Sequence, residues 1–232
     1  MPTNSRARVA IAVAAMTMFV TACLPRFGPW SGDGDGPLVA VVGDSLVHAA
    51  QFDGGNDPDD PDRFLDDELA AGGYRSTVSA RIGADTADLA RLEAPAEPAD
   101  VVIVALGTND LDRGVTVERA IANIVDFLDR LAPRCAAVVT VVVDAPDWGL
   151  DVTAPPYNAA LADLGATRDD LVVADWATRS SSHPEWFAHD QVHHTEAGRA
   201  AYRQLVRETA DECAARIDPT GPEPEPTEPG GP

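Results

Sequence analysis

Short, strongly apolar segments recur along this chain, and helical patterns separate them. Residues 101–106 are apolar at every position, as expected of a strand buried on both faces. We predict five strands, at residues 38–42, 74–80, 101–106, 136–143 and 171–174. Because helices separate the strands, the connections are right-handed crossovers and the strands form one parallel sheet covered on both faces.

Helical spacing is clearest between Val117 and Leu131, where apolar residues recur every three or four positions. Thr116 is placed to cap this helix, and Pro133 follows its end. Further helices are predicted at residues 64–71, at 157–164, and from Thr195 to 215. The sequence therefore predicts one α/β domain over residues 38–217, with its site at the carboxyl ends of the strands.

The first 22 residues have the pattern of an export signal. Arg6 and Arg8 precede an uncharged apolar run at residues 9–20, which is too short to remain as a membrane span of about 20 residues. The sequence Val-Thr-Ala-Cys at 20–23 resembles a bacterial lipobox, which predicts a mature chain that begins at a lipidated Cys23. The same small residues also suit ordinary signal peptidase and plain secretion.

The two flanks and the charge of the chain limit its partners. Residues 23–37 are rich in Gly, Pro and Asp and are predicted to be a tether, whereas 218–232 are predicted to be a disordered tail. The formal net charge is -21 at pH 7. Such a surface repels nucleic acid and anionic lipid headgroups, so we expect membrane contact only through a lipid on Cys23.

Cys135 and Cys213 are the other two cysteines. An exported protein permits a disulfide between them, and two separate buried thiols fit the sequence equally well.

An acidic segment at residues 53–62 offers oxygen ligands of the kind that Ca²⁺ binds. The ordered spacing of a calcium loop is absent, however, and the prolines favour a solvated loop. We therefore predict neither a metal site nor a cofactor.

Small polar motifs follow the first three predicted strands. Gly43 permits a tight turn that exposes the Ser45 hydroxyl, and Gly83 can bring a backbone N–H close to a ligand. The Asn109 side chain is a neutral donor suited to a developing oxyanion. Each motif alone is also an ordinary turn, but all of them fall at the carboxyl edge of the predicted sheet.

A cluster of histidines follows the last strand. Asp190 and His193 are three residues apart, so one turn brings the carboxylate to the imidazole. That contact would fix the tautomer of the ring and leave its other nitrogen free to deprotonate a serine. The alternatives are a surface cluster of histidines and an adventitious metal site.

These four blocks, in this order, resemble the SGNH (GDSL) hydrolase family over residues 38–217. Ser45, Gly83, Asn109 and His193 match the four residues that give the family its name. The resemblance implies a three-layer α/β/α sandwich with flavodoxin-like topology. It also implies that Ser45 is the nucleophile, His193 the base and Asp190 its partner, and that the Ser45 and Gly83 N–H groups and the Asn109 amide form an oxyanion hole.

The stretch from Asp175 to Asp190 is similar to the end of SGNH domains attached to membrane acyltransferases of the cell envelope. No multi-span membrane portion accompanies the domain in this sequence, so we expect hydrolysis rather than transfer. Gln191 stands where a Gly is common in the family. His194 is a rival base, but the spacing from Asp190 favours His193.

We therefore expect a secreted or surface-anchored serine esterase that hydrolyses short acyl esters, above all acetyl esters, on envelope carbohydrate. Only 6% of residues are aromatic and the predicted site loops are polar or small, so no long apolar groove is expected. Trp148, Trp176 and Trp186 can stack on a sugar, although core or rim packing is the simpler role. The alternatives are an O-acetyltransferase with the same triad, a lipase or thioesterase, and a non-catalytic binding module.

Overall fold

The computed structural model describes residues 26–32, 36–52 and 64–218. The predicted signal peptide with Cys23, the acidic segment 53–62 and residues 219–232 of the predicted tail lie outside the described residues. Within the three described ranges, none of the helices combines the length and the apolar character that crossing a bilayer requires.

A five-stranded parallel sheet forms the centre of the domain, in the order β2-β1-β3-β4-β5. Its strands are β1 (Leu38–Gly43), β2 (Arg75–Ala80), β3 (Val101–Ala105), β4 (Cys135–Val139) and β5 (Leu171–Ala174). Every residue of β3 and β4 is buried, which explains their continuously apolar sequence. The strand order is that of flavodoxin-like folds, as the resemblance implied.

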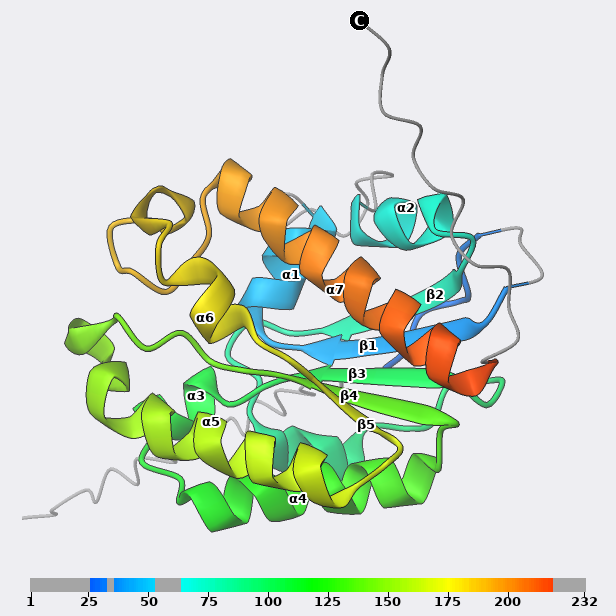
Figure 1. Ribbon diagram of the computed structural model, residues 1–232, viewed down its shortest axis with the longest axis horizontal. Coiled ribbons are helices and arrows are strands. Elements are labelled where there is room, and N and C mark those ends of the chain that lie inside the picture. The colour runs from blue at the N-terminus through cyan, green and yellow to red at the C-terminus, as the bar shows by residue number, and fades with distance from the viewer. Residues whose placement is uncertain (1–25, 33–35, 53–63, 219–232) are drawn as a thin grey trace, which may run out of the picture.

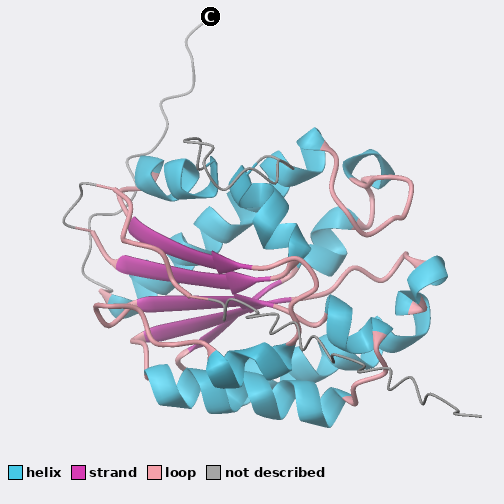
Figure 2. Ribbon diagram, turned by 180° about the vertical axis from the view of Figure 1, so that it is seen from behind, coloured by secondary structure: helices cyan, strands magenta, loops and turns pink. Residues whose placement is uncertain are grey.

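Helices cover both faces of this sheet (Figures 1 and 2). Above it in Figure 1 lie α1 (Ser45–Phe52), α2 (Phe64–Ala71) and α7 (Glu196–Ile217), and below it lie α4 (Val117–Leu131) and α5 (Leu150–Thr167). The short helices α3 (Thr108–Asp112) and α6 (Trp176–Ser180) follow β3 and β5 at the carboxyl edge. Short 3₁₀ helices are η1 (Thr86–Arg91), η2 (Pro146–Trp148) and η3 (Pro184–Trp186). The predicted three-layer sandwich is confirmed.

Strand β4 is shorter than the β-branched run predicted, because the chain leaves the sheet after Val139. At Val141, the side chain of Asn158 replaces a neighbouring strand: its oxygen accepts the Val141 N–H at 2.9 Å and its amide donates to the Val141 carbonyl at 2.7 Å. The predicted strand over residues 136–143 was therefore four residues too long at its end.

Helix α5 begins seven residues before the predicted start at Tyr157. It contains Pro155 and Pro156, which lack the N–H groups that would bond to the carbonyls of Asp151 and Val152. Those two residues are exposed, so water can take the place of the lost donors. The prolines consequently do not prevent the helix from beginning at Leu150.

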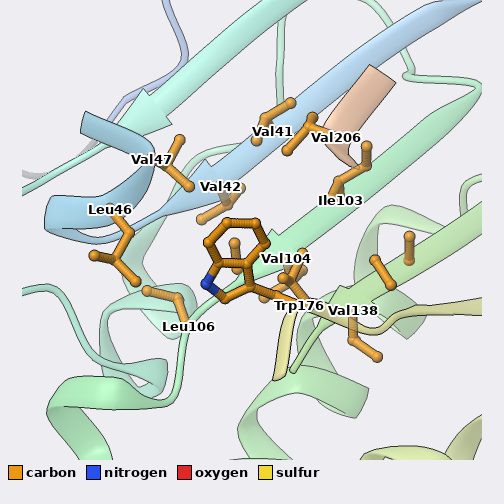
Figure 3. Close-up of a cluster of buried hydrophobic side chains, with 14 of the residues drawn as sticks. Val41, Val42, Leu46, Val47, Ile103, Val104, Leu106, Val138, Trp176 and Val206 are labelled. Atoms are coloured by element: carbon orange, nitrogen blue, oxygen red, sulfur yellow. The ribbon is translucent and has the colours of Figure 1, made fainter. Parts of the chain in front are cut away.

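Trp176 anchors the core beneath the carboxyl edge of the sheet. Figure 3 shows its indole among the side chains of Val42, Leu46 and Val104, and only 1% of the residue is exposed. Its ring also stacks on Trp186, with centroids 5.6 Å apart. Trp176 is therefore a core residue, and the sugar-stacking role considered for it is excluded.

The edge strand β2 is partly covered by residues 26–32 of the predicted tether. Ser31 and Ser76 exchange two backbone hydrogen bonds, of 2.7 and 3.0 Å, in an antiparallel bridge. Trp30 packs against the core, and the Arg75 guanidinium lies 6.0 Å from the centre of its ring. The folded part of the chain therefore begins before Leu38, and β2 has a partner at one end of its open edge.

Cys135 and Cys213 form a disulfide, which decides between the two alternatives that the sequence left open. The bond joins the first residue of β4 to the last turns of α7, at the amino edge of the sheet and away from Ser45. Both cysteines are buried.

Loss of this disulfide is expected to destabilise the domain strongly. The bond links residues 78 positions apart, and in the chain-entropy model a loop of this length contributes about 4.5 kcal/mol. Urea unfolding of the Cys135→Ala/Cys213→Ala protein measures the loss. Reduction of the wild type with dithiothreitol is the matched control, because it opens the loop without changing a side chain. An unchanged urea midpoint in both would contradict the expectation.

Candidate active site

The turn between β1 and α1 places Ser45 at the carboxyl edge of the sheet. A Cβ atom at Gly43 would lie 2.1 Å from a methyl group of Val47, so the chain needs glycine there to turn directly into the helix. The Asp44 carboxylate then accepts the Leu46 N–H at 2.9 Å, which caps the start of α1. The local sequence thus fixes Ser45 as the first residue of the helix.

Ser45, His193 and Asp190 form a continuous chain of hydrogen bonds, called the triad below. Ser45 Oγ lies 3.0 Å from His193 Nε2, and His193 Nδ1 lies 2.6 Å from Asp190 Oδ2. The other oxygen of Asp190 accepts the backbone N–H groups of Val192 and His193 at 3.1 and 3.0 Å. The structure therefore brings together the three residues that the sequence analysis singled out.

Asp190 is suited to hold the His193 ring in one tautomer. Burial would raise the pKa of the Asp190 carboxyl, but the hydrogen bonds from the His193 ring and from two backbone N–H groups hold that pKa below its ordinary value. The carboxylate is ionised at neutral pH and accepts from Nδ1–H. The lone pair of Nε2 then faces the Ser45 hydroxyl.

Gly83 and Asn109 flank Ser45, at the ends of the neighbouring strands β2 and β3. Gly83 has a φ of +74°, a conformation that favours glycine. Within the described part of the chain, the backbone N–H groups of Ser45 and Gly83 donate to no acceptor. Asn109 Nδ2 donates to the Ala84 carbonyl at 2.9 Å and, more weakly, to Asp44 Oδ2 at 3.3 Å.

Asp110 and Arg113 hold the Gly83 loop against the Asn109 segment, and the sequence alone indicated neither residue. The buried Asp110 carboxylate accepts both the N–H and the hydroxyl of Thr86, at 3.0 and 2.5 Å. Arg113 donates to the Gly83 carbonyl at 2.9 Å and to Asp85 at 2.6 Å. Together these contacts fix Gly83 and Asn109, two of the three predicted oxyanion donors, relative to each other.

A comparison with models of known protein families identifies the family of this chain. The model of the GDSL-like Lipase/Acylhydrolase family matches residues 41–201. The chain belongs to this family. The matched residues run from β1 into α7 and include Ser45, Gly83, Asn109, Asp190 and His193.

One curated relative is the peptidoglycan O-acetyltransferase OatA of Listeria monocytogenes. It is 35% identical to this chain over 106 residues, which is 45% of this chain but only 15% of the relative's length. This GDSL-family chain therefore corresponds to a small part of that protein.

Solved structures of other proteins share the fold. The C-terminal catalytic domain of Streptococcus pneumoniae OatA aligns with a TM-score of 0.57 and 19% identity, over 78% of this chain and 94% of that one. An acetylxylan esterase from Geobacillus stearothermophilus aligns with a TM-score of 0.59 and 16% identity, over 81% of this chain and 97% of that one. At these identities the two structures support the fold alone.

Asp44 is a buried carboxyl for which the sequence alone indicated no role. It is 1% exposed, and burial raises its pKa to about 6 although the Leu46 N–H and the nearby His193 ring act in the opposite direction. Above that pH the group is a carboxylate that accepts from both Leu46 and Asn109. Asp44 therefore links the helix of Ser45 to the side chain of Asn109.

Trp148 and Trp186 take different places around the triad. The ring of the half-buried Trp148 makes a T-shaped contact with the His193 ring, with centroids 5.9 Å apart and planes at 68°. Trp186 stacks between Trp176 and the ring of His183, at 5.6 and 3.9 Å. Of the three tryptophans considered for a sugar, Trp148 is the one in ring contact with the triad.

His194 is not placed to act as a rival base. Its ring is 5% exposed and is enclosed by Trp176, Phe187 and Tyr202, with centroids 4.9 to 5.7 Å away. Burial, assisted by the charges of His193 and Arg199, lowers the pKa of His194 to about 3 from an ordinary 6.5. His194 is therefore a neutral member of an aromatic cluster.

The burial of His194 predicts sensitivity to acid. The unfolded chain binds a proton at His194 below about pH 6.5, whereas the folded domain does so only near pH 3. The contribution of His194 to the free energy of unfolding should therefore fall as the pH drops below 6.5, by about 3 kcal/mol at pH 4.5. His194→Phe should remove this part of the dependence.

Urea unfolding of both proteins at pH 7.5 and 4.5 tests this expectation. Asp44 acts in the opposite direction, because its raised pKa stabilises the fold as the pH falls through 6. Both proteins keep Asp44, so the difference between them isolates His194. Equal losses of stability in the two proteins would refute the assignment.

Proposed function

We propose that this chain is a serine esterase in which Ser45 is the nucleophile, His193 the general base and Asp190 the residue that orients the base. The observation that carries the proposal is the unbroken path of hydrogen bonds from Ser45 Oγ to Asp190, with lengths of 3.0 and 2.6 Å. Nucleophile and base within hydrogen-bond reach, with a third group that orients the base, are the requirements of this chemistry.

In the proposed reaction, Ser45 Oγ attacks the ester carbonyl while its proton passes to His193 Nε2. The tetrahedral intermediate collapses when that proton moves from Nε2 to the oxygen of the leaving alcohol. In the second half-reaction, His193 Nε2 takes a proton from the water molecule that attacks the acyl-serine. The proton then returns to Ser45 Oγ as the free acid leaves. The anionic Asp190 stabilises the imidazolium that forms in each half-reaction.

The oxyanion of the intermediate would be stabilised by the N–H groups of Ser45 and Gly83 and by the Asn109 amide. Asn109 Nδ2 can turn one hydrogen toward the oxyanion by giving up its longer bond, the 3.3 Å contact with Asp44. The 2.9 Å bond to the Ala84 carbonyl keeps the side chain in place.

The proposed substrates are short acyl esters, above all acetyl esters, of carbohydrate. Two cavities that touch residues beside Ser45, one lined by Asp44 and Leu46 and one by Gly43 and Ala84, each hold only about 10 Å³, roughly the space of one water molecule. A long acyl chain would find no wall in either. The names of the related acetylxylan esterase and peptidoglycan O-acetyltransferase favour acetylated carbohydrate.

Transfer of the acetyl group to a carbohydrate hydroxyl is the second candidate, favoured by the 35% identity to OatA over 106 residues. The same triad serves both reactions, and they differ in whether water or a sugar accepts the acyl group.

We also propose that the enzyme acts outside the cytoplasm, at the cell envelope. The Cys135–Cys213 disulfide is typical of an oxidising compartment. The signal at residues 1–22 and a lipid on Cys23 remain predictions. Mass spectrometry of the N-terminal peptide from the native host tests both, and an unmodified Cys23 terminus would indicate plain secretion.

The substrate proposal is tested with nitrophenyl esters from acetate to palmitate, followed by acetylated xylan and acetylated peptidoglycan. We expect kcat/KM to decline beyond about six carbons, because added methylene groups find no surface to bury against. A rate that rises steadily to palmitate would contradict the short-chain proposal. Acetylated oligosaccharides formed from an acetyl donor, in place of free acetate, would identify a transferase.

A further inference from the structure

A pocket of about 420 Å³ adjoins the turn that carries Asp190 and His193, although no triad residue lines it. Gln191 and Ala188 form one wall, and the Ala188 N–H donates to the His193 carbonyl at 2.7 Å. Val142 and Asp144 also line the pocket, and they belong to the β4–α5 connection that carries Trp148. The volume lies within the range of about 300–1,000 Å³ typical of small-molecule sites.

The pocket lies at the β4 and β5 end of the carboxyl edge of the sheet, and this position indicates which part of the substrate it would bind. Gly83, Ser45 and Asn109 follow β2, β1 and β3, whereas the pocket is lined by residues that follow β4 and β5, among them Ala177 and Ser180 of α6. The leaving alcohol must lie within hydrogen-bond reach of His193 Nε2 to receive its proton. The alcohol part of an ester therefore extends toward His193 and the pocket, and its acyl part extends toward the other strands.

The lining of the pocket combines apolar surface with polar side chains. Its apolar surface comes from Val142, Val143, Ala177, Pro184, Phe187 and Ala188. Its exposed polar side chains are Asp144, Thr178, Ser181 and Gln191. A sugar ring matches this combination, because its faces carry C–H groups and its rim carries hydroxyls. Among the described residues that line the pocket, Asp144 alone is ionisable, so an anionic sugar would find no cation among them.

The backbone conformation of Gln191 independently indicates that this wall of the pocket has a functional role. Gln191 has a φ of +61°, in the left-handed region that residues other than glycine adopt at a cost. A glycine would relax this turn, because it adopts the left-handed region without that cost. What glutamine adds is an amide in the wall of the pocket, and strained residues of this kind gather at functional sites.

We infer that this pocket is a subsite for an uncharged sugar unit on the alcohol side of the scissile ester, an inference that rests on the proposed esterase function. Its occupant is the sugar next to the acetylated one. The enzyme should therefore prefer acetylated oligosaccharides to acetylated monosaccharides.

The first test compares kcat/KM of the wild type on acetylated xylotriose, acetylated xylose and nitrophenyl acetate. We expect the trisaccharide to be favoured over the monosaccharide by about tenfold or more, the effect of a few well-placed contacts. Equal values for the two saccharides overturn the inference but leave the esterase proposal standing. A protein that hydrolyses none of the three overturns the proposed function as well.

The second test uses two variants of the lining. Ser181→Trp fills the pocket from an exposed position, and Gln191→Gly removes the amide while relieving the backbone. Each should lower the ratio of kcat/KM on the trisaccharide to that on nitrophenyl acetate by about fivefold or more. Ala162→Trp, on the exposed side of α5, is the matched control and should keep the wild-type ratio.

The thermal stability of Gln191→Gly separates binding from a structural role. We expect an unchanged or higher melting temperature together with the lower ratio. A lower ratio that only accompanies a loss of stability would overturn the assignment. If Ser181→Trp instead impairs nitrophenyl octanoate more than the trisaccharide, the pocket holds the acyl chain and the inference is wrong.

Discussion

Ser45→Ala is expected to lower kcat on nitrophenyl acetate by roughly 10⁵–10⁶-fold, because removing the nucleophile leaves only binding and oxyanion stabilisation. His193→Ala should lose about as much, since the two residues act as one unit joined by the 3.0 Å hydrogen bond. The double variant should then be little worse than either single one. Steady-state kinetics on the purified proteins measure all three.

The fold should survive both substitutions. Ser45 and His193 are only partly buried, and neither belongs to the apolar core. Circular dichroism and urea unfolding therefore serve as controls, with midpoints close to that of the wild type. Turnover near the wild-type rate in Ser45→Ala would remove Ser45 from the reaction.

Asn109→Ala is expected to lower kcat by about 10²–10³-fold with little change in KM, the usual result of removing one oxyanion donor. The physical reason is that the charge on the carbonyl oxygen develops only after attack, so the ground state loses little when the amide is removed. Nitrophenyl acetate kinetics over a full range of substrate concentrations separate the two parameters.

A matched variant distinguishes donation from positioning in this prediction. Asp44→Asn keeps the Asn109 amide but replaces the carboxylate that accepts it at 3.3 Å. We expect a smaller loss of kcat than in Asn109→Ala, because the donor is still present. If Asn109→Ala raises KM and leaves kcat unchanged, Asn109 binds the substrate instead.

Much of the fold could be predicted because buried strands consist of apolar residues, which are visible in the local sequence. Strands β3 and β4 are buried at every position and are apolar throughout. The end of β4 could not be predicted, because the side chain of Asn158, seventeen residues later, replaces a strand at Val141. A contact that depends on tertiary structure leaves no periodic signal near residue 141.

The residues of the candidate active site could also be predicted in part from the sequence. Ser45, Asn109 and His193 each follow a strand, and parallel strands bring their carboxyl ends to one edge. The contrast between His193 and His194 shows the limit of this reasoning: one ring reaches Ser45 while the next lies buried among aromatic side chains. The role of Asp44 could not be predicted either, because the sequence Gly-Asp-Ser at residues 43–45 is also typical of an ordinary turn.

The most direct test of the central proposal is covalent labelling of Ser45. Methylsulfonyl fluoride reacts with an activated serine, so peptide mass spectrometry should find one methylsulfonyl group, located on Ser45, with activity lost in proportion to labelling. His193→Ala and Ser45→Ala should remain unlabelled, because the first lacks the base and the second the nucleophile. Labelling that is spread over other serines, or that persists in Ser45→Ala, would contradict the account.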